Sequence, residues 1–387
     1  MIANLHQQFN WGDISAYATR TIEQALAIQR IPAPTFLERE RAQRVAEQFE
    51  RVGLRQIDLD DLHNVYGLLP GQTASHSGVL FTAHTDTVFD LNTPLDVRYQ
   101  GDKIIYAPGI GDNSIAVAAL LTVAEFMHEQ GIVPPCDIWF VATTREEGLG
   151  DLGGMRAAFR RCRHRISAVV NLEGLAFGHI YNAGIAVRRL RIEVTAEGGH
   201  SWLHYGQPSA IHSLMQIGAR ITAITPPQHP RTTYNIGVIE GGRSVNSIAS
   251  SAVMQLDMRS EESAPLALLE REVREIAAAA ARGGVQVAIE VIGDRPAGSI
   301  SSDHPLVRAA LAALAQVKVE GVLESGSTDG NVPLAAGCPA VTVGVTRGGN
   351  AHRTDEYIEI TPVADGLRQI VLLLMTTAEM VASGGLR

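Results

Sequence analysis

In the first part of the chain, segments with apolar residues at helical spacing alternate with short, continuous apolar runs. Apolar residues at helical spacing predict helices over 14–30, 36–53, 113–128 and 151–160. Short apolar runs between them predict buried strands: VLFTA (79–83), IWFVATT (138–144) and AVVNL (168–172). The same pattern returns after Ser301, with a helix over 304–316, a strand over 340–345 and a helix over 362–382. This predicts an α/β domain with a mixed, mostly parallel sheet and flanking helices.

The pattern changes between these two parts. Apolar and polar residues alternate, as in strands with one exposed face, over 187–197, 234–242, 251–260 and 285–293. Helical spacing of apolar residues predicts helices over 208–223 and 264–282. A strand–helix–strand–strand–helix–strand order is typical of a small α+β sandwich. We therefore expect a larger domain built from 1–184 and 297–387, with a smaller domain at 185–296 inserted in it.

Composition narrows the class of protein. The chain has 387 residues, of which 45% are hydrophobic, and a formal net charge of −9. Its one basic cluster, at 160–165, is too short to indicate nucleic-acid binding. The three cysteines form no CxxC pair, and we find neither a signal peptide nor an apolar run long enough to span a bilayer. We expect a cytoplasmic protein with no nucleic-acid or membrane partner.

Imidazole and carboxylate groups gather just beyond the predicted strands and at one helix start. They are His84 and Asp86 after VLFTA, Asp112 before the helix at 113–128, Glu146 and Glu147 after IWFVATT, Glu173 after AVVNL, and His352 after the strand at 340–345. Ligands of open α/β sheets bind beyond the carboxyl ends of the strands, so we expect these groups to converge.

A set of two histidines and several carboxylates suits Zn²⁺. A bridging carboxylate holds two metals about 3.5–4 Å apart, and a further carboxylate is then needed as general base. Glu146 and Glu147 can supply a ligand and a base from adjacent positions. His84 would be a ligand, and Asp86, two residues on along an extended segment, would accept its other ring N–H and fix its tautomer.

Six motifs carry a family resemblance: AHTDT, GIGDN, TTREEGLG, NLEG, GGHSW and AHRTDE. In order and spacing the chain resembles, from about residue 15 to its end, the dinuclear-zinc exopeptidases and amidohydrolases. That family includes acetylornithine deacetylase, succinyl-diaminopimelate desuccinylase, glutamate carboxypeptidase, peptidase T and bacterial dipeptidases. Together the motifs are highly specific, although each alone is weak.

The resemblance implies two divalent ions per chain, Zn²⁺ by default, with Mn²⁺ or Co²⁺ as alternatives. It gives His84, Asp112 and Glu173 to one metal, and Asp112, Glu147 and His352 to the other, with Asp112 bridging. It also makes Glu146 the general base and Asp86 the orienting aspartate, and implies a cis peptide bond between Asp112 and Asn113.

The resemblance further implies that the inserted domain acts as a lid and forms a homodimer. His200 in EGGHSW matches a lid histidine that reaches the partner subunit's site and polarises the scissile carbonyl. Asn246 and Arg259 match positions that bind the carboxylate end of the substrate. The segment GSTDGN (326–331) resembles a loop that lines the substrate.

These expectations favour hydrolysis of a peptide-type amide bond in a small peptide by an exopeptidase. An N-acyl-amino-acid deacylase uses the same chemistry and remains the alternative. A non-catalytic binding protein on the same fold would have lost a ligand or the base, and none is lost here. A mononuclear zinc enzyme would not need both Asp112 and Glu147, and a serine or cysteine nucleophile is disfavoured because no GxSxG occurs.

Overall fold

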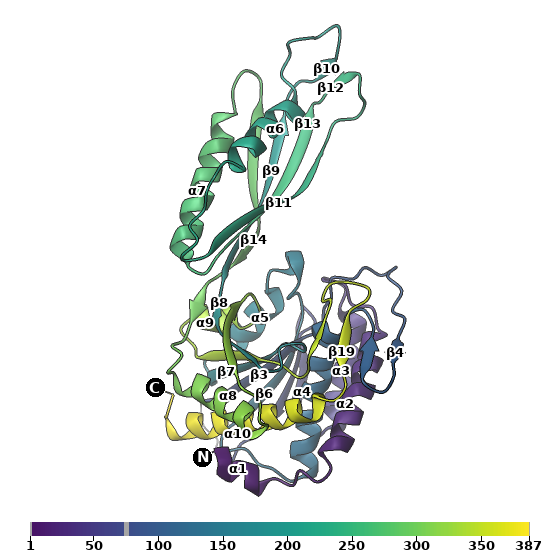
Figure 1. Cartoon of the computed structure of the whole chain (residues 1–387), viewed down its shortest axis with the longest axis vertical. Helices are drawn as coiled ribbons and strands as arrows, with labels where there is room; N and C mark the ends of the chain where they lie inside the picture. Colours follow the sequence, from purple (N-terminus) through teal and green to yellow (C-terminus); the bar gives the residue numbers. More distant parts are fainter. Residues whose placement is uncertain (1, 73–76, 387) are drawn as a thin grey trace. The chain divides into compact units, whose positions relative to one another are not determined.

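The computed structural model describes residues 2–72 and 77–386. The chain forms two compact units, Met1–Gly184 with Gly298–Arg387, and Ile185–Ala297. Figure 1 labels the helices and strands of the two units and colours them by residue number.

The first unit is built on a mixed sheet whose centre is parallel. Strands β6, β3, β7 and β17 are neighbours and run parallel. Strands β1 and β2 pair antiparallel with each other, β2 with β6, and β8 with β17 and β15, whereas β16 pairs in parallel with β8. The bounds are β1 Arg55–Leu59, β2 Val65–Leu69, β3 Gly78–His84, β6 Ile138–Thr143, β7 Ile166–Leu172, β8 His179–Gly184, β15 Gly298–Ser299, β16 Val322–Gly326 and β17 Ala340–Val343. This confirms the predicted α/β class.

Strand β3 is buried along its whole length because helices cover both faces of the sheet. Val79, Phe81 and Ala83 belong to a core shared with one group of helices. Leu80 points the other way, into a core shared with a second group, and His84 lies on that same face by the two-residue period of a strand. The first group includes α2 Ile14–Gln29, α4 Ile115–Glu129 and α10 Val363–Ser383, and the second includes α5 Gly153–Cys162 and α9 Asn331–Ala335.

The segment Ile110–Glu129, which ends in helix α4, has the length and hydropathy of a membrane-crossing helix, and 89% of its most apolar window is buried inside the protein. The prediction that no apolar run of this length exists was therefore wrong. Helix α4 itself begins at Ile115 rather than at the predicted 113, because Asp112 and Asn113 have non-helical backbone angles in the irregular turn Ile110–Ser114.

A second, small sheet brings two distant segments of the first unit together. Its order is β18 Gly348–Gly349, β19 Tyr357–Glu359, β5 Ile104–Tyr106 and β4 Arg98–Gln100. Pairing of β19 with β5 places the loop 350–356 beside the segment 107–114. The unit also contains α1 Ile2–Gln8, α3 Arg39–Arg51, α8 Pro305–Gln316 and the short helical turn Gly148–Gly150.

The second unit is an antiparallel sheet with two helices on one core. The sheet order is β11 Thr232–Gly241, β13 Ser251–Ser260, β9 Ala186–Thr195 and β14 Gln286–Arg295. Helices α6 Ala210–Ile221 and α7 Ser263–Ala279 share a core with these strands through residues such as Leu214, Ile217 and Val273. A separate two-residue ladder joins β10 Gly199–His200 to β12 Ser247–Ile248.

Candidate metal centre

Five side chains of the first unit converge at one edge of the main sheet. His84 ends β3, Glu173 follows the last residue of β7, and Glu147 lies four residues beyond the end of β6; the other two are Asp112, in the turn before α4, and His352, in the loop between β18 and β19. Since β6, β3 and β7 run parallel, their carboxyl ends meet at the same edge.

Asp112 lies between the two imidazole rings. Its Oδ1 atom is 3.1 Å from Nε2 of His84, and its Oδ2 atom is 3.1 Å from Nε2 of His352. One carboxylate thus presents a different oxygen to each histidine, which is the arrangement that a carboxylate bridging two metals requires.

Each imidazole also faces a second carboxylate. Glu173 Oε2 lies 3.5 Å from His84 Nε2, and Glu147 Oε1 lies 3.0 Å from His352 Nε2. Two ligand atoms at about 2.0–2.1 Å from one tetrahedral ion are about 3.3 Å apart, so these separations fit the donor atoms of a zinc-type ion. One ligand atom each from His84, Asp112 and Glu147 also lie within 4.8 Å of one another. The residues present therefore fit the implied metals.

The carboxylates favour positive charge on both rings. Hydrogen bonds to Asp112 and Glu147 raise the pKa of His352 to about 10. Burial opposes a charge on His84, but Glu173, Asp112 and Asp86 together raise its pKa well above the ordinary value. Burial likewise opposes ionisation of Asp112, whose pKa the two histidines hold below its usual range. A dication in the same place replaces these protons, so metal binding is coupled to proton release.

Asp86 is fully buried and holds three segments together. Its carboxylate accepts the backbone N–H groups of Glu146 and Glu147 at 2.9 Å each and the hydroxyl of Thr35 at 2.9 Å. His84 Nδ1 lies 3.1 Å from the carbonyl oxygen of Asp86 and 3.5 Å from its carboxylate. Burial acts against the ionised form, yet His84 and the two N–H groups keep the pKa of Asp86 below its usual value. Asp86 thereby orients both the imidazole and the segment that carries the two glutamates.

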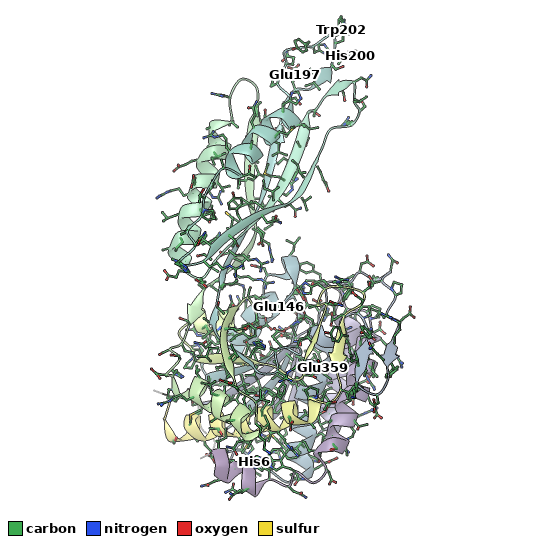
Figure 2. All side chains as sticks on the ribbon, viewed as in Figure 1. His6, Glu146, Glu197, His200, Trp202 and Glu359 are labelled. Atoms are coloured by element: carbon green, nitrogen blue, oxygen red, sulfur yellow. The ribbon has the colours of Figure 1, made fainter. Side chains whose placement is uncertain are left out.

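Glu146 directly precedes Glu147 in the segment that follows β6. It is 5% exposed and its neighbour Glu147 is 6% exposed. Figure 2 labels Glu146 among the side chains of the first unit. Its main chain is fixed by Asp86, so its carboxyl group is held near the centre on a constrained backbone.

Asn113 connects the bridging aspartate to the Glu173 segment. The Asp112–Asn113 peptide bond is cis, as the resemblance implied. The Asn113 side chain donates to the carbonyl of Leu172 at 3.0 Å and accepts the N–H of Gly174 at 2.8 Å, so it binds the residues on both sides of Glu173.

Two buried acids near the centre could not be assigned an individual role from the sequence. Glu356 accepts hydrogen bonds from the backbone of the Asp112 turn. Asp329, in the predicted substrate-lining segment 326–331, accepts the hydroxyl of Thr143 at 2.6 Å, and burial raises its pKa to about 7. Their sequence signals were slight: an acid four residues after His352, and an acid inside GSTDGN.

His200, Asn246 and Arg259 belong to the second unit. His200 pairs with Ser247 in the β10–β12 ladder, and the next residue, Ser201, donates its N–H to the carbonyl of Asn246 at 3.0 Å, so His200 and Asn246 lie together. Figure 2 labels His200 at one end of the unit. Arg259 lies near the last residue of β13 and is bonded to Asp257 at 2.8 Å. Eight residues of extended β13 separate Ser251 from Arg259, or about 26 Å. The structure therefore joins His200 with Asn246 and separates both from Arg259 within one copy of this unit.

The ring of His200 has its orientation fixed locally. Its Nδ1 atom accepts the backbone N–H groups of Trp202 at 3.2 Å and of Leu203 at 3.4 Å. A neutral imidazole that accepts at Nδ1 carries its proton on Nε2. The turn 200–203 thus leaves His200 an Nε2–H donor, which is what polarising a carbonyl oxygen requires.

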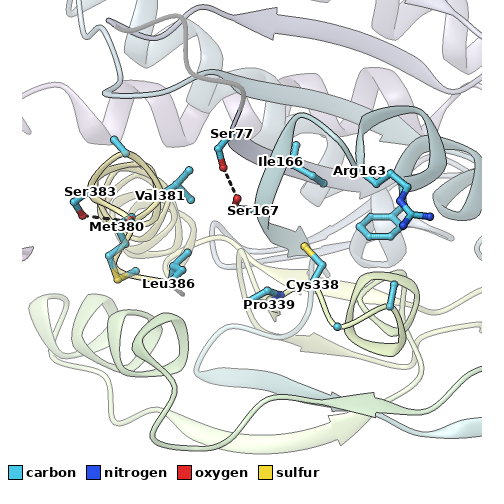
Figure 3. Close-up of a pocket in the computed structure, with 15 residues that line it drawn as sticks. Ser77, Arg163, Ile166, Ser167, Cys338, Pro339, Met380, Val381, Ser383 and Leu386 are labelled. Atoms are coloured by element: carbon cyan, nitrogen blue, oxygen red, sulfur yellow. Dashed lines mark hydrogen bonds between the residues drawn. The ribbon is translucent and has the colours of Figure 1, made fainter.

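A cavity of about 580 Å³ lies elsewhere in the first unit (Figure 3). Its lining includes Ser77, which precedes β3, and Ile166, which begins β7, together with Arg163 and Cys338. These are the amino ends of the strands, at the opposite edge of the sheet from His84 and Glu173. The cavity is therefore separate from the metal centre.

A mostly parallel sheet whose strand ends present two histidines around a shared carboxylate defines a metal-dependent hydrolase class. The family model described as peptidase family M20/M25/M40 matches residues 80–376, more than half of the chain. The chain belongs to this family, and this places it among the metallopeptidases and amidohydrolases.

Curated relatives with a similar sequence include probable carboxypeptidases. A probable carboxypeptidase of Aspergillus terreus (strain NIH 2624 / FGSC A1156) is 27% identical over 217 residues, covering 53% of this chain and 49% of that protein. The chain thus matches about half the length of such curated relatives.

Solved structures show the same fold. Aminopeptidase PepT from Bacillus cereus ATCC 10987 has a TM-score of 0.74 at 21% identity, covering 93% of this chain and 99% of that one. An amidase of the hydantoinase/carbamoylase family from Burkholderia vietnamiensis has a TM-score of 0.73 at 16% identity, covering 93% and 97%.

Proposed function

We propose that this chain hydrolyses a peptide-type amide bond in a small substrate, as an exopeptidase such as a di- or tripeptidase, an aminopeptidase or a carboxypeptidase. The observation that carries the proposal is the position of Asp112, with one oxygen 3.1 Å from each of two imidazoles. Family membership supports the same class of reaction.

Each residue has a definite task in this reaction. His84, Asp112 and Glu173 would hold one divalent ion, and Asp112, Glu147 and His352 the other. Such ions, zinc by the donor set, would supply Lewis acidity when bound, which would polarise the scissile carbonyl and lower the pKa of a water molecule. Glu146 takes the proton of that water and passes it to the leaving nitrogen. Asp86 keeps Glu146, Glu147 and His84 in register through its hydrogen bonds.

In the proposed site, the second unit of another copy of the chain supplies the residues that one copy lacks. A tripeptide spans at most about 11 Å, whereas His200 and Arg259 are separated by more than twice that length within one unit. One copy therefore does not supply both residues to one substrate. We propose a homodimer through the second unit, in which His200 and Asn246 come from one chain and Arg259 from the other, with the second unit acting as a lid.

N-acyl-amino-acid deacylation is the alternative reaction, and the fold similarity to an amidase supports keeping it. Both reactions break an amide bond and need the same base and metals. They differ in whether the group on the acyl side of the scissile bond is an amino acid. A cytoplasmic location for either activity stays a prediction.

The test combines metal content with turnover on purified protein. We expect about two zinc ions per chain by elemental analysis, and cleavage of members of a panel of dipeptides, tripeptides and N-acyl amino acids. Glu146→Gln should keep both metals and lose about 10²–10⁴-fold in turnover. Glu359→Gln, the same substitution on β19, is the matched control and should change neither.

The outcomes separate the proposals. Cleavage of N-acyl amino acids alone would assign the chain to the deacylases. Loss of metal in Glu146→Gln would make Glu146 a ligand rather than the base. Absence of bound metal even after zinc is added back would overturn the proposed function.

A further inference from the structure

Glu356 is a buried carboxylate that none of the proposed catalytic steps uses. It is 0% exposed and accepts three backbone N–H groups, from Gly109 at 3.3 Å, Gly111 at 2.6 Å and Asp112 at 2.8 Å. Its own carbonyl oxygen accepts the N–H of Ala107 at 2.9 Å. One residue thus binds the whole turn that carries the bridging aspartate.

The turn is shaped to receive a carboxylate. Gly109 has a φ of 71°, in the left-handed region that a residue with a Cβ atom rarely adopts. A left-handed residue in such a turn lets neighbouring N–H groups point into one concavity, which is an anion-binding arrangement of the backbone. The carboxylate of Glu356 fills this concavity, and no water or ion is needed to satisfy those donors.

Glu356 is also the end of the loop that carries His352. Within that loop Asn350 donates to the carbonyl and carboxylate of Asp355 at 3.2 and 3.0 Å, and Arg353 donates to the same carboxylate at 2.8 and 3.1 Å. The next residue, Tyr357, pairs with Tyr106 across β19 and β5. The His352 loop is therefore braced internally, and Glu356 joins it to the Asp112 turn.

We infer that Glu356 is a positioning residue that sets the distance between Asp112 and His352, and through it chiefly the affinity of the metal that His352 would hold. This inference rests on the proposed metal centre. His84 is placed independently of Glu356, by strand β3 and by its contacts with Asp86 and Glu173. Glu356 therefore positions one of the three ligands of the ion at His84, namely Asp112, but two of the three ligands of the other ion, Asp112 and His352. The ion held by Asp112, Glu147 and His352 is the one that depends more strongly on Glu356.

A glutamine does not replace this carboxylate. The carboxylate has two acceptor oxygens for three converging donors, whereas a glutamine amide has one acceptor and turns two N–H donors toward the same groups. Glu356→Gln should therefore move the turn relative to the loop with almost no change in side-chain volume.

The experiment measures zinc binding by competition with a chelator, using the full chain. The parent should bind two zinc ions, and Glu356→Gln should bind one of them at least tenfold more weakly than the parent while the affinity for the other changes much less. His352→Ala marks the pattern expected when the same metal loses a ligand directly. Glu359→Gln, three residues further along the same segment, should bind both ions as the parent does.

Glu356→Asp keeps the charge but is one methylene shorter, and it should weaken the same metal by a smaller factor. It carries the test if Glu356→Gln does not fold. Retention of both ions within twofold of the parent in whichever variant folds would overturn the role of Glu356, as would equal weakening of both. A parent chain that binds no zinc would instead overturn the metal centre itself.

Discussion

At the scale of single residues, Asp329 shows how burial alone prepares a group to respond to pH. It is 0% exposed, and its hydrogen bond from Thr143 does not offset the loss of hydration. Its pKa is raised from 3.8 to about 7. Thr82, Asn171, Thr342 and Thr328 continue a hydrogen-bonded row across the same region of the sheet.

This raised pKa predicts a pH-dependent stability. Between about pH 4 and 7 the folded chain holds a proton on Asp329 that the unfolded chain has released, so the free energy of unfolding falls as the pH rises through this window. The contribution is on the order of 4 kcal/mol at most. Asp329→Asn, which cannot ionise, should remove this slope in chemical unfolding measured between pH 5 and 8 with a chelator present.

The exposed Asp303 supplies the comparison for this measurement. Asp303→Asn should leave the slope as in the parent chain. A slope that is the same in Asp329→Asn and in the parent would show that Asp329 ionises as an ordinary carboxyl group.

The sequence predicts residues whose side-chain type indicates metal binding. It does not predict residues whose role depends on partners that are distant along the chain. His84, Asp112, Glu147, Glu173 and His352 each follow a readable strand or helix boundary, and the structure brings all five together. Glu356 could not be found in this way, because its partners are backbone N–H groups about 245 residues away. Burial of that kind exists only once the small sheet has formed.

At the scale of elements, helix α3 is attached to the metal-centre edge of the sheet by one buried cation. Arg41 is 2% exposed and donates to the carbonyl of Ile31 at 2.6 and 3.0 Å and to that of Thr85 at 2.8 Å. Thr85 follows His84, so this guanidinium satisfies the chain where it leaves β3. Burial lowers the pKa of Arg41 to about 10, which still leaves it charged at neutral pH.

Arg41→Ala should lower the free energy of unfolding by about 3 kcal/mol or more, because two buried carbonyl groups lose a charged donor. Arg44, on the same helix, pairs at the surface with Glu47 at 3.2 Å and offers a matched substitution. Arg44→Ala should change stability by no more than about 0.5 kcal/mol in the same chemical unfolding experiment. Equal effects of the two substitutions would show that the buried hydrogen bonds of Arg41 contribute little.

Periodicity predicted most long elements within a few residues, including α2, β13 and α10, because each presents a continuous apolar face. Strands such as β8 and β19 were not predicted, since one or two buried positions do not establish a period. The distance between Asn246 and Arg259 also escaped sequence reasoning. Asn246 and Arg259 are only thirteen positions apart in the sequence. Most of the residues between them lie in the extended strand β13, which separates its two ends in space.

At the scale of the whole molecule, the opposite placement of His200 and Arg259 predicts complementation between two inactive chains. In the proposed dimer, His200→Ala chains retain Arg259 and Arg259→Ala chains retain His200. A mixed pair then contains one complete site and one site that lacks both residues. Unfolding, mixing and refolding the two variants should restore about a quarter of parental turnover, because half of the pairs are mixed.

Unfolding and refolding either variant alone should restore no turnover. No recovery in the mixed sample, although mixed pairs are present by native mass spectrometry, would show that the two residues do not act from different chains. A chain that stays monomeric at the assay concentration would contradict the dimer itself.

The chain leaves the first unit and returns to it at two positions that lie side by side. Gly184, its last residue before the second unit, pairs antiparallel with Gly298, its first residue after it, and Ala183 pairs with Ser299. These are the two arms of a hairpin whose turn has been replaced by 113 residues, Ile185–Ala297. A two-residue turn is enough to close such arms. The larger body is therefore topologically complete without its insertion, and the insertion can lengthen, shorten or diverge in sequence without disturbing the strand order that assembles the metal ligands.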